Sequence, residues 1–266
     1  LTNYSKSYQA EQMYYAPVAV LPPPIGTNIS TLYCFLSKVD PWVDDNNPTQ
    51  PTQDQRYIKQ TFKNIFVAKE VTTNDIIPVI KRYDWTTGTN YDYYRDDIDM
   101  FAIDANGNLI NQFYVRNRYD QVFKCLWNGG NGGLGVPSTQ EPYFQPGQYQ
   151  TDNVFYGTDG YKWKYMYTID AGSKIKFMDQ NWIPVPVGQN IPDTNSPLGY
   201  GSIDAINVLN GGSGYSSSQP ITVTVVGDGT GATAQVNGIS NGAIQDIQVL
   251  TPGSGYTYAN VIITST

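Results

Sequence analysis

Histidine is missing from all 266 residues of the sequence. It is the usual general base of serine and cysteine hydrolases and the commonest metal ligand, so its absence argues against most hydrolase and zinc mechanisms. Cysteine is scarce: Cys34 and Cys125 each stand among apolar and aromatic neighbours. That setting is typical of buried, reduced thiols that pack as small hydrophobic residues, with a disulfide as the alternative.

Positive charge is also limited, since 16 Lys and Arg residues stand against 23 Asp and Glu residues and the net charge is -7. A negative balance repels nucleic-acid phosphates and anionic lipids. No apolar run approaches the roughly 20 residues of a membrane helix, and the first residues lack the apolar core of a signal peptide. We therefore expect neither nucleic acid nor membrane as a partner.

Aromatic residues, glycine and proline are plentiful: 22 Tyr, 5 Trp, 9 Phe, 25 Gly and 17 Pro. This composition favours short strands joined by turns over long helices. The predicted fold class is mainly β.

Three regions follow from shifts in composition. Residues 1–29 are proline-rich and predict an extended N-terminal arm. Residues 30–198 predict a β domain with one long helix at about 53–71, because Thr52 and Gln55 have the spacing of a capping box and apolar residues follow at helical spacing. Residues 199–266 contain no Lys or Arg, which marks a boundary and a separate Gly-rich module.

The stretch from Tyr161 to Ile169 alternates, with Tyr161, Trp163, Tyr165 and Tyr167 on one predicted face. An aromatic face of this kind packs in a core or forms a protein interface, and both interpretations stay open.

An internal repeat organises the last region. The pattern I-x-x-I-x-V-L-x-x-G-S-G-Y occurs from Ile203 to Tyr215 and again, 41 residues later, from Ile244 to Tyr256. Each copy predicts a short strand that runs into a glycine turn and positions a tyrosine. The turn residues are Gly212, Gly214 and Tyr215, and Gly253, Gly255 and Tyr256. The second copy stops before any equivalent of the "GDGTGA" turn, so we expect a longer parent chain.

Candidate sites for chemistry are weak. The GSGY turns lack the Lys that a phosphate-binding loop needs, and "GDGTGA" lacks both a following helix and a nearby positive charge. Asp97 and Asp99 would share a face of a strand, as a glycosidase pair or a divalent-ion site requires, but a solvated edge next to Arg95 explains them as well. The stretch Asp104–Asn108 predicts a hairpin turn. We expect no catalytic residue, no metal ligand and no cofactor.

The segments "TLYCFLSKVDPW", "IIPVIKRYDW", "DGYKWKYMYTID" and "WIPVPV" occur in this order between Thr31 and Val187. In order and spacing they resemble the baseplate wedge subunit of T-even-type contractile-tailed bacteriophages. The residues of this match that we expect to organise the fold and its interfaces are Asp40, Pro41, Trp42, Arg82, Asp84, Trp85, Tyr161, Trp163 and Tyr165.

The resemblance implies layered antiparallel sheets of the β-sandwich type and a homodimer within each wedge. It also implies contacts with other wedge proteins, no catalytic activity, and a place in the virion tail after assembly in the host cytoplasm. The GSGY module departs from the family pattern and suggests an added part that contacts a tail fibre or a neighbouring wedge.

Two other functions remain as alternatives. One is a carbohydrate-binding, adhesin-type β module of a phage tail, in which exposed Tyr and Trp residues stack on sugar rings. The other is a glycan-degrading enzyme that uses Asp97 and Asp99.

Overall fold

The structure is a computed structural model that describes residues 32–37, 43–44, 46–47, 54–130, 135–145, 154–186 and 201–265. The chain forms two compact units, Leu1–Ile77 and Pro78–Thr266. The predicted arm at residues 1–29 and the residues Asp40, Pro41 and Trp42 lie outside the described residues. The boundary expected near residue 198 falls inside the second unit, in a stretch that is likewise not described.

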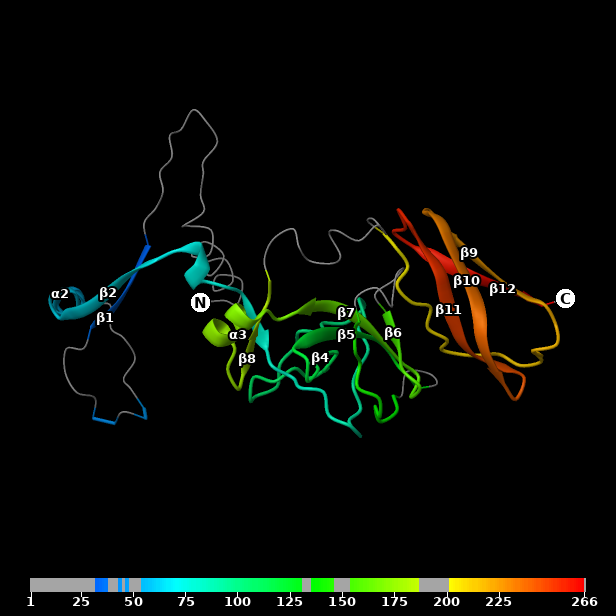
Figure 1. Ribbon diagram of the computed structural model, residues 1–266, viewed down its shortest axis with the longest axis horizontal. Helices are drawn as coiled ribbons and strands as arrows, with labels where there is room; N and C mark the ends of the chain where they lie inside the picture. Colours follow the sequence, from blue (N-terminus) through cyan, green and yellow to red (C-terminus); the bar gives the residue numbers. More distant parts are fainter. Residues whose placement is uncertain are drawn as a thin grey trace, which may run out of the picture. The chain divides into compact units, whose positions relative to one another are not determined.

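The first unit contains a two-stranded antiparallel sheet and a short helix (Figure 1). Its elements are β1 (Leu32–Ser37), α2 (Gln55–Lys63), β2 (Ile65–Val71) and the 3-10 turn η1 (Thr73–Asp75). The pairing of β1 with β2 sets Cys34 opposite Lys69.

The helix predicted at 53–71 is wrong in its second half. Asp54 caps the helix by accepting a hydrogen bond from the Arg56 amide at 3.0 Å, and the helix ends at Lys63. Ile65 and Phe66 begin β2 instead. Their spacing suits a helix, but hydrogen bonds to β1 are available only to an extended chain, and this long-range pairing overrides the local pattern.

The second unit is built around a four-stranded antiparallel sheet with the order β4-β5-β7-β6. Its strands are β4 (Tyr114–Arg116), β5 (Gln121–Asn128), β6 (Val154–Tyr156) and β7 (Tyr161–Thr168). A small second sheet pairs β3 (Val79–Lys81) with β8 (Trp182–Pro184), and α3 (Ala171–Phe177) precedes β8. The strand expected from the alternation between Tyr161 and Ile169 is confirmed as β7.

The predicted turn at Asp104–Asn108 is present. The Asp104 carboxylate accepts hydrogen bonds from the amides of Asn106 and Asn108 at 2.9 and 2.8 Å, and these bonds lower its pKa, the Asn108 bond most strongly. The apolar runs beside the turn form one bridge, between Ile103 and Leu109, in place of two regular strands.

The core of the second unit occupies both faces of the main sheet. Phe123 and Trp163 belong to one buried cluster, while Val122 and Tyr167 belong to another. The register of β5 against β7 shifts between Val122 and Phe123. Because of the resulting bulge, Tyr167 and Trp163 lie on opposite faces of the sheet. The single aromatic face predicted for β7 is therefore divided between the two faces.

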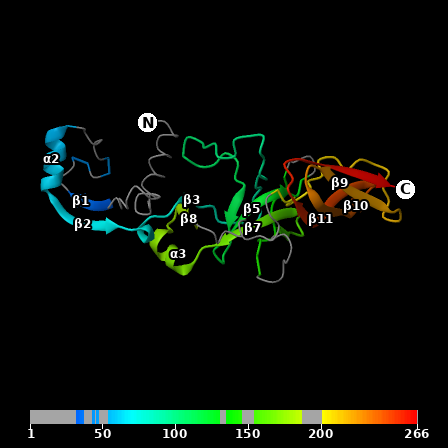
Figure 2. The same ribbon diagram turned by 90° about the horizontal axis from the view of Figure 1, so that it is seen from above.

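A second four-stranded antiparallel sheet follows in the chain, with the order β11-β10-β9-β12 (Figure 2). Its strands are β9 (Ile221–Gly227), β10 (Thr230–Ser240), β11 (Ala243–Ser254) and β12 (Ala259–Ser265). A tight turn with positive φ at Asn241 and Gly242 joins β10 to β11. The protein is mainly β, with several antiparallel sheets and two α-helices among the described residues.

The two copies of the repeat differ in regularity. The second copy forms β11, but the first forms no regular strand and pairs with β11 through one bridge, between Ile206 and Ile247. These two residues occupy the same position in the two copies. Within the described ranges, the structure contains no helix long and apolar enough to cross a membrane.

Candidate functional site

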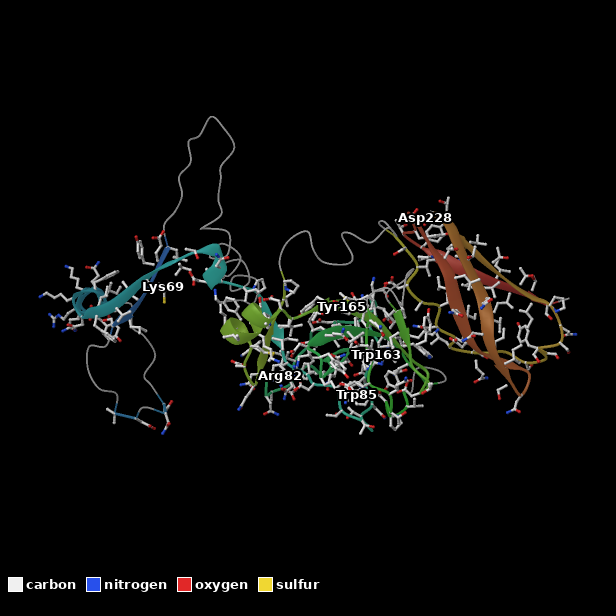
Figure 3. The ribbon with its side chains drawn as sticks, viewed as in Figure 1. Lys69, Arg82, Trp85, Trp163, Tyr165 and Asp228 are labelled. Atoms are coloured by element: carbon white, nitrogen blue, oxygen red, sulfur yellow. The ribbon has the colours of Figure 1, made fainter. Side chains whose placement is uncertain are left out.

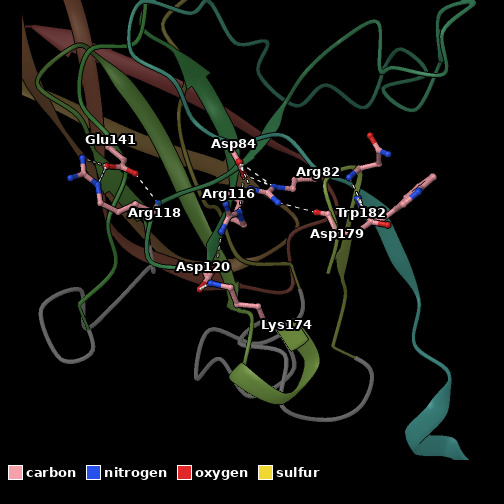
Figure 4. Close-up of polar contacts among 10 residues, drawn as sticks. Arg82, Asp84, Arg116, Arg118, Asp120, Glu141, Lys174, Asp179 and Trp182 are labelled. Carbon is pink, nitrogen blue, oxygen red and sulfur yellow. Dashed lines mark hydrogen bonds and ion pairs between the residues drawn. The ribbon is translucent and has the colours of Figure 1, made fainter. Parts of the chain in front are cut away.

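Arg82 and Asp84 of the segment "IIPVIKRYDW" belong to a chain of ion pairs, called the ladder below (Figure 4). Arg82 and Arg116 both bind the Asp84 carboxylate, at 2.6 and 2.8 Å. Arg116 continues to Asp120, which also binds Lys174 of α3 at 2.7 Å. Partial burial raises the pKa of Asp84, but the hydrogen bonds from the two arginines outweigh it and lower the pKa to about 2. The ladder therefore joins the residues after β3 to β4 and α3.

Trp85, labelled in Figure 3, is connected through Ser138 to Asp159, in the loop before β7. The Trp85 indole donates to the Ser138 hydroxyl at 3.0 Å, and this hydroxyl donates to Asp159 at 3.1 Å. Asp159 also accepts hydrogen bonds from the amides of Thr139 and Tyr161 at 2.7 and 3.2 Å. One carboxylate thus fixes the loop before β7.

The aromatic residues of β7 form part of the core. Tyr161 and Trp163 are 0% exposed, and their rings stack at 5.4 Å. Tyr165 is half-buried and stacks on Phe144 at 4.1 Å. Of the two interpretations of this face, core packing describes Tyr161 and Trp163.

The candidate carboxylates Asp97 and Asp99 each have a partner within the chain. Asp97 lies in an exposed ion pair with Arg95 at 2.6 Å, and the Arg95 hydrogen bond lowers its pKa. Asp99 accepts a hydrogen bond from the Phe101 amide at 2.9 Å. A glycosidase acid needs a raised pKa, which Asp97 lacks. Within the described residues, no three His, Cys, Asp or Glu side chains are grouped so that they could hold a metal ion.

The repeat turns have the backbone that the sequence predicts. Gly212, Gly214, Gly253 and Gly255 all have positive φ, between 64° and 87°, which disfavours any residue with a Cβ atom. Gly253 is the most constrained, because a Cβ atom there would lie 2.6 Å from backbone atoms of β10. The glycines of these turns are therefore needed for the backbone conformation of the chain.

Lys162 of β7 binds both copies of the repeat with one ammonium group. Its Nζ atom donates to the carbonyl oxygens of Ile206 at 3.0 Å and Ile247 at 3.2 Å, which are equivalent positions in the two copies. Asp246 forms an ion pair with the same Nζ atom at 2.7 Å. The Lys162 side chain is only 4% exposed, so the charge is buried and compensated at the point where the two copies meet.

Neither a protein-family model nor a curated protein matches this chain.

Further contacts hold residues 201–265, called the repeat module below, against the main sheet. Lys164 forms an ion pair with Asp204 at 2.9 Å, with the lysine side chain 10% exposed. The side-chain amide of Asn207 donates a hydrogen bond to the Leu126 carbonyl of β5 at 2.9 Å. We call the contacts of Lys162 and Lys164 the lysine anchor. It pairs two lysines of β7 with two of the three acidic residues that the sequence has after residue 199.

The third acidic residue, Asp228, acts within the module. It lies in the "GDGTGA" turn and accepts hydrogen bonds from the Thr257 side chain, the Thr257 amide and the Tyr258 amide. These bonds, led by that of the Thr257 side chain, lower the pKa of Asp228 to about 2. The turn thereby connects β9 to the segment after the second GSGY, which is a structural use of the stretch that was weighed as a phosphate loop.

Sequence reasoning did not identify the lysine anchor. In the alternating pattern of this stretch, Lys162 and Lys164 fall on the face opposite the aromatic residues. The available signal was the combination of two lysines at alternate positions in a strand with a later region whose only charges are acidic.

The two cysteines differ. Cys125 is buried as expected, and burial raises the pKa of its thiol. Cys34 is exposed, contrary to the expectation of a buried thiol, because β1 has only β2 beside it in its sheet. Both are free thiols in the structure.

Proposed function

We propose that this chain is a structural virion protein, a subunit of the baseplate wedge of a contractile phage tail. It joins neighbouring wedge proteins and takes part in the rearrangement of the baseplate on infection. The proposal rests on the resemblance of the segments between Thr31 and Val187 to wedge subunits. The same proposal includes a layered β-sandwich and a homodimer within each wedge. It also includes a role of the repeat module in contacts with a fibre or a neighbouring wedge.

The observation that carries the proposal is the exposure of apolar side chains in the first unit. None of its described residues is buried. Leu36, Phe62 and Phe66 are 57%, 61% and 68% exposed. A two-stranded sheet is marginal by itself, and clusters of exposed apolar residues mark surfaces that bind other proteins. Such a unit suits a subunit whose stable state is an assembly.

The distribution of charge agrees with a role in assembly. Among the described residues, the acidic side chains weighed for catalysis, Asp97 and Asp99, bind Arg95 and the Phe101 amide, and the carboxylates of the ladder and the lysine anchor are paired within the chain. This arrangement favours rigidity over chemistry.

The test is reconstitution of the assembly. The tagged chain, produced together with the other structural proteins of the particle, is expected to co-purify with several of them. Phe66→Ser should reduce their recovery at least tenfold, because a hydroxyl replaces an apolar contact surface. Ile175→Ser is the matched control, since Ile175 is 85% exposed on α3 of the other unit. Recovery of the chain alone, or equal recovery with both variants, would overturn the proposal.

The adhesin-type module remains the competing function. It differs from the wedge role in that the chain would have no virion partners. The aromatic residues of β7 do not favour it, because Tyr161 and Trp163 are fully buried and cannot stack on a sugar.

A further inference from the structure

A cavity of about 270 Å³ lies beside the lysine anchor, within the second unit. On the side of the main sheet its lining includes Tyr156, Thr158 and Lys162; on the side of the repeat module it includes Asn237 and Gln245. Its walls therefore come from segments far apart in the sequence, which the docking of the module brings together.

The cavity has no unbalanced charge. Lys162 and Asp246 are the charged residues of the lining, and they are paired at 2.7 Å. The second oxygen of Asp246 accepts a hydrogen bond from the Asn237 side chain at 3.0 Å. A phosphate would meet a lysine that is already neutralised, and a metal ion would find a single carboxylate, which is too few for a stable site. Ionic ligands are thus disfavoured.

The remaining polar groups suit hydroxyl groups. Asn237 and Gln245 are exposed. Their side-chain amides donate to Asp246 and to the Ala243 carbonyl at 3.0 and 3.2 Å. An amide has a second N–H group and an oxygen with which it can still bind a sugar hydroxyl. The Thr158 hydroxyl donates to Gln140 at 2.9 Å, which leaves its oxygen able to accept a further bond. The Tyr156 ring, which has the Lys162 Nζ atom 5.9 Å from its centroid, is aromatic surface of the kind that packs on the C–H face of a sugar.

The size of the cavity sets the size of the ligand. A volume of about 270 Å³ is slightly below the usual range of small-molecule sites, roughly 300–1,000 Å³, so the ligand must be small. We propose that this cavity binds a neutral saccharide of one or two rings, with Asn237 and Gln245 as the hydrogen-bonding residues of the module. This property goes beyond the proposed role in the wedge, and either proposal can fail while the other holds.

The experiment uses the full chain on an array of neutral mono- and disaccharides. Each sugar that binds is then titrated in its free form by saturation-transfer NMR. We expect at least one sugar to bind, and Asn237→Ala and Gln245→Ala to weaken it at least tenfold. Gln248→Ala is the matched control, because it lies on the same strand as Gln245 and is not part of the lining. It should bind as the unmodified chain does.

Two results would overturn the proposal. One is that the unmodified chain binds none of the sugars at millimolar concentration. The other is that both cavity variants, with melting temperatures equal to that of the unmodified chain, bind a sugar as tightly as the control variant does.

Discussion

Replacement of Lys162 by methionine is the most direct perturbation of the lysine anchor. Methionine keeps most of the length and apolar volume of the lysine stem but has no ammonium group. In Lys162→Met, Asp246 loses its ion pair, and the carbonyls of Ile206 and Ile247 lose their shared donor. The variant therefore removes three contacts from one point of the module without opening a large cavity.

The size of the effect follows from burial. Removal of one partner from a buried ion pair costs about 3–5 kcal/mol, and a buried acceptor left without a donor costs about 1–3 kcal/mol. Asp246 is 28% exposed, so water can solvate part of its charge. We expect Lys162→Met to lower the free energy of unfolding of the second unit by at least about 3 kcal/mol.

Urea denaturation measures this change, and amide hydrogen exchange localises it. Exchange should accelerate first in β11, which provides Asp246 and Ile247. Lys174→Met is the control, because Lys174 is 43% exposed in its ion pair with Asp120 and such surface pairs contribute less than about 1 kcal/mol. The double variant Lys162→Met with Asp246→Asn should recover part of the loss, because no unpaired charge remains. The reasoning is refuted if Lys162→Met costs no more than Lys174→Met.

Three further predictions concern single residues. The pKa of Asp84 falls from its usual value of about 4 to about 2. Its pairing therefore stabilises the fold above pH 4, and this stabilisation is lost as the pH falls towards 2. Asp84→Asn should make stability, measured by circular dichroism, depend less on pH in this acidic range. A thiol reagent should label Cys34 and spare Cys125 in the native chain, and assembly should protect Cys34; labelling of Cys125 without denaturant would contradict its burial. Gly253→Ala should lower the unfolding free energy by more than about 2 kcal/mol, and Gly214→Ala, with open space around it, by about 1 kcal/mol; equal melting temperatures would contradict the steric argument.

The strands of the main sheet could be predicted where both neighbours of a strand lie within the sheet. β5 and β7 are buried along most of their length, so they are apolar or alternate cleanly in sequence. The aromatic face of β7 was predicted only in part. The bulge that separates Trp163 from Tyr167 arises from the register against β5, and no property of β7 alone encodes it.

The wrong helix end and the missed lysine anchor have the same physical origin. Ile65 and Phe66 fit a helical stripe and a strand equally well, and the strand forms because β1 pairs with it. The ion pair of Lys162 with Asp246 joins residues far apart in the chain, and composition cannot specify which lysine meets which aspartate. Local patterns were sufficient for glycine turns and buried strands, whereas contacts distant in sequence decided the helix end and the lysine anchor.

Lys162 can bind no more than two copies of the repeat in this way. An ammonium group has three protons, and here one lies against a carbonyl of the first copy, one against the equivalent carbonyl of the second copy, and one against Asp246. The coordination of this nitrogen is complete with two copies. In a third strand-turn unit, added by duplication, the equivalent carbonyl would find no proton of Lys162 left to bind. It would need a hydrogen-bond donor from another residue.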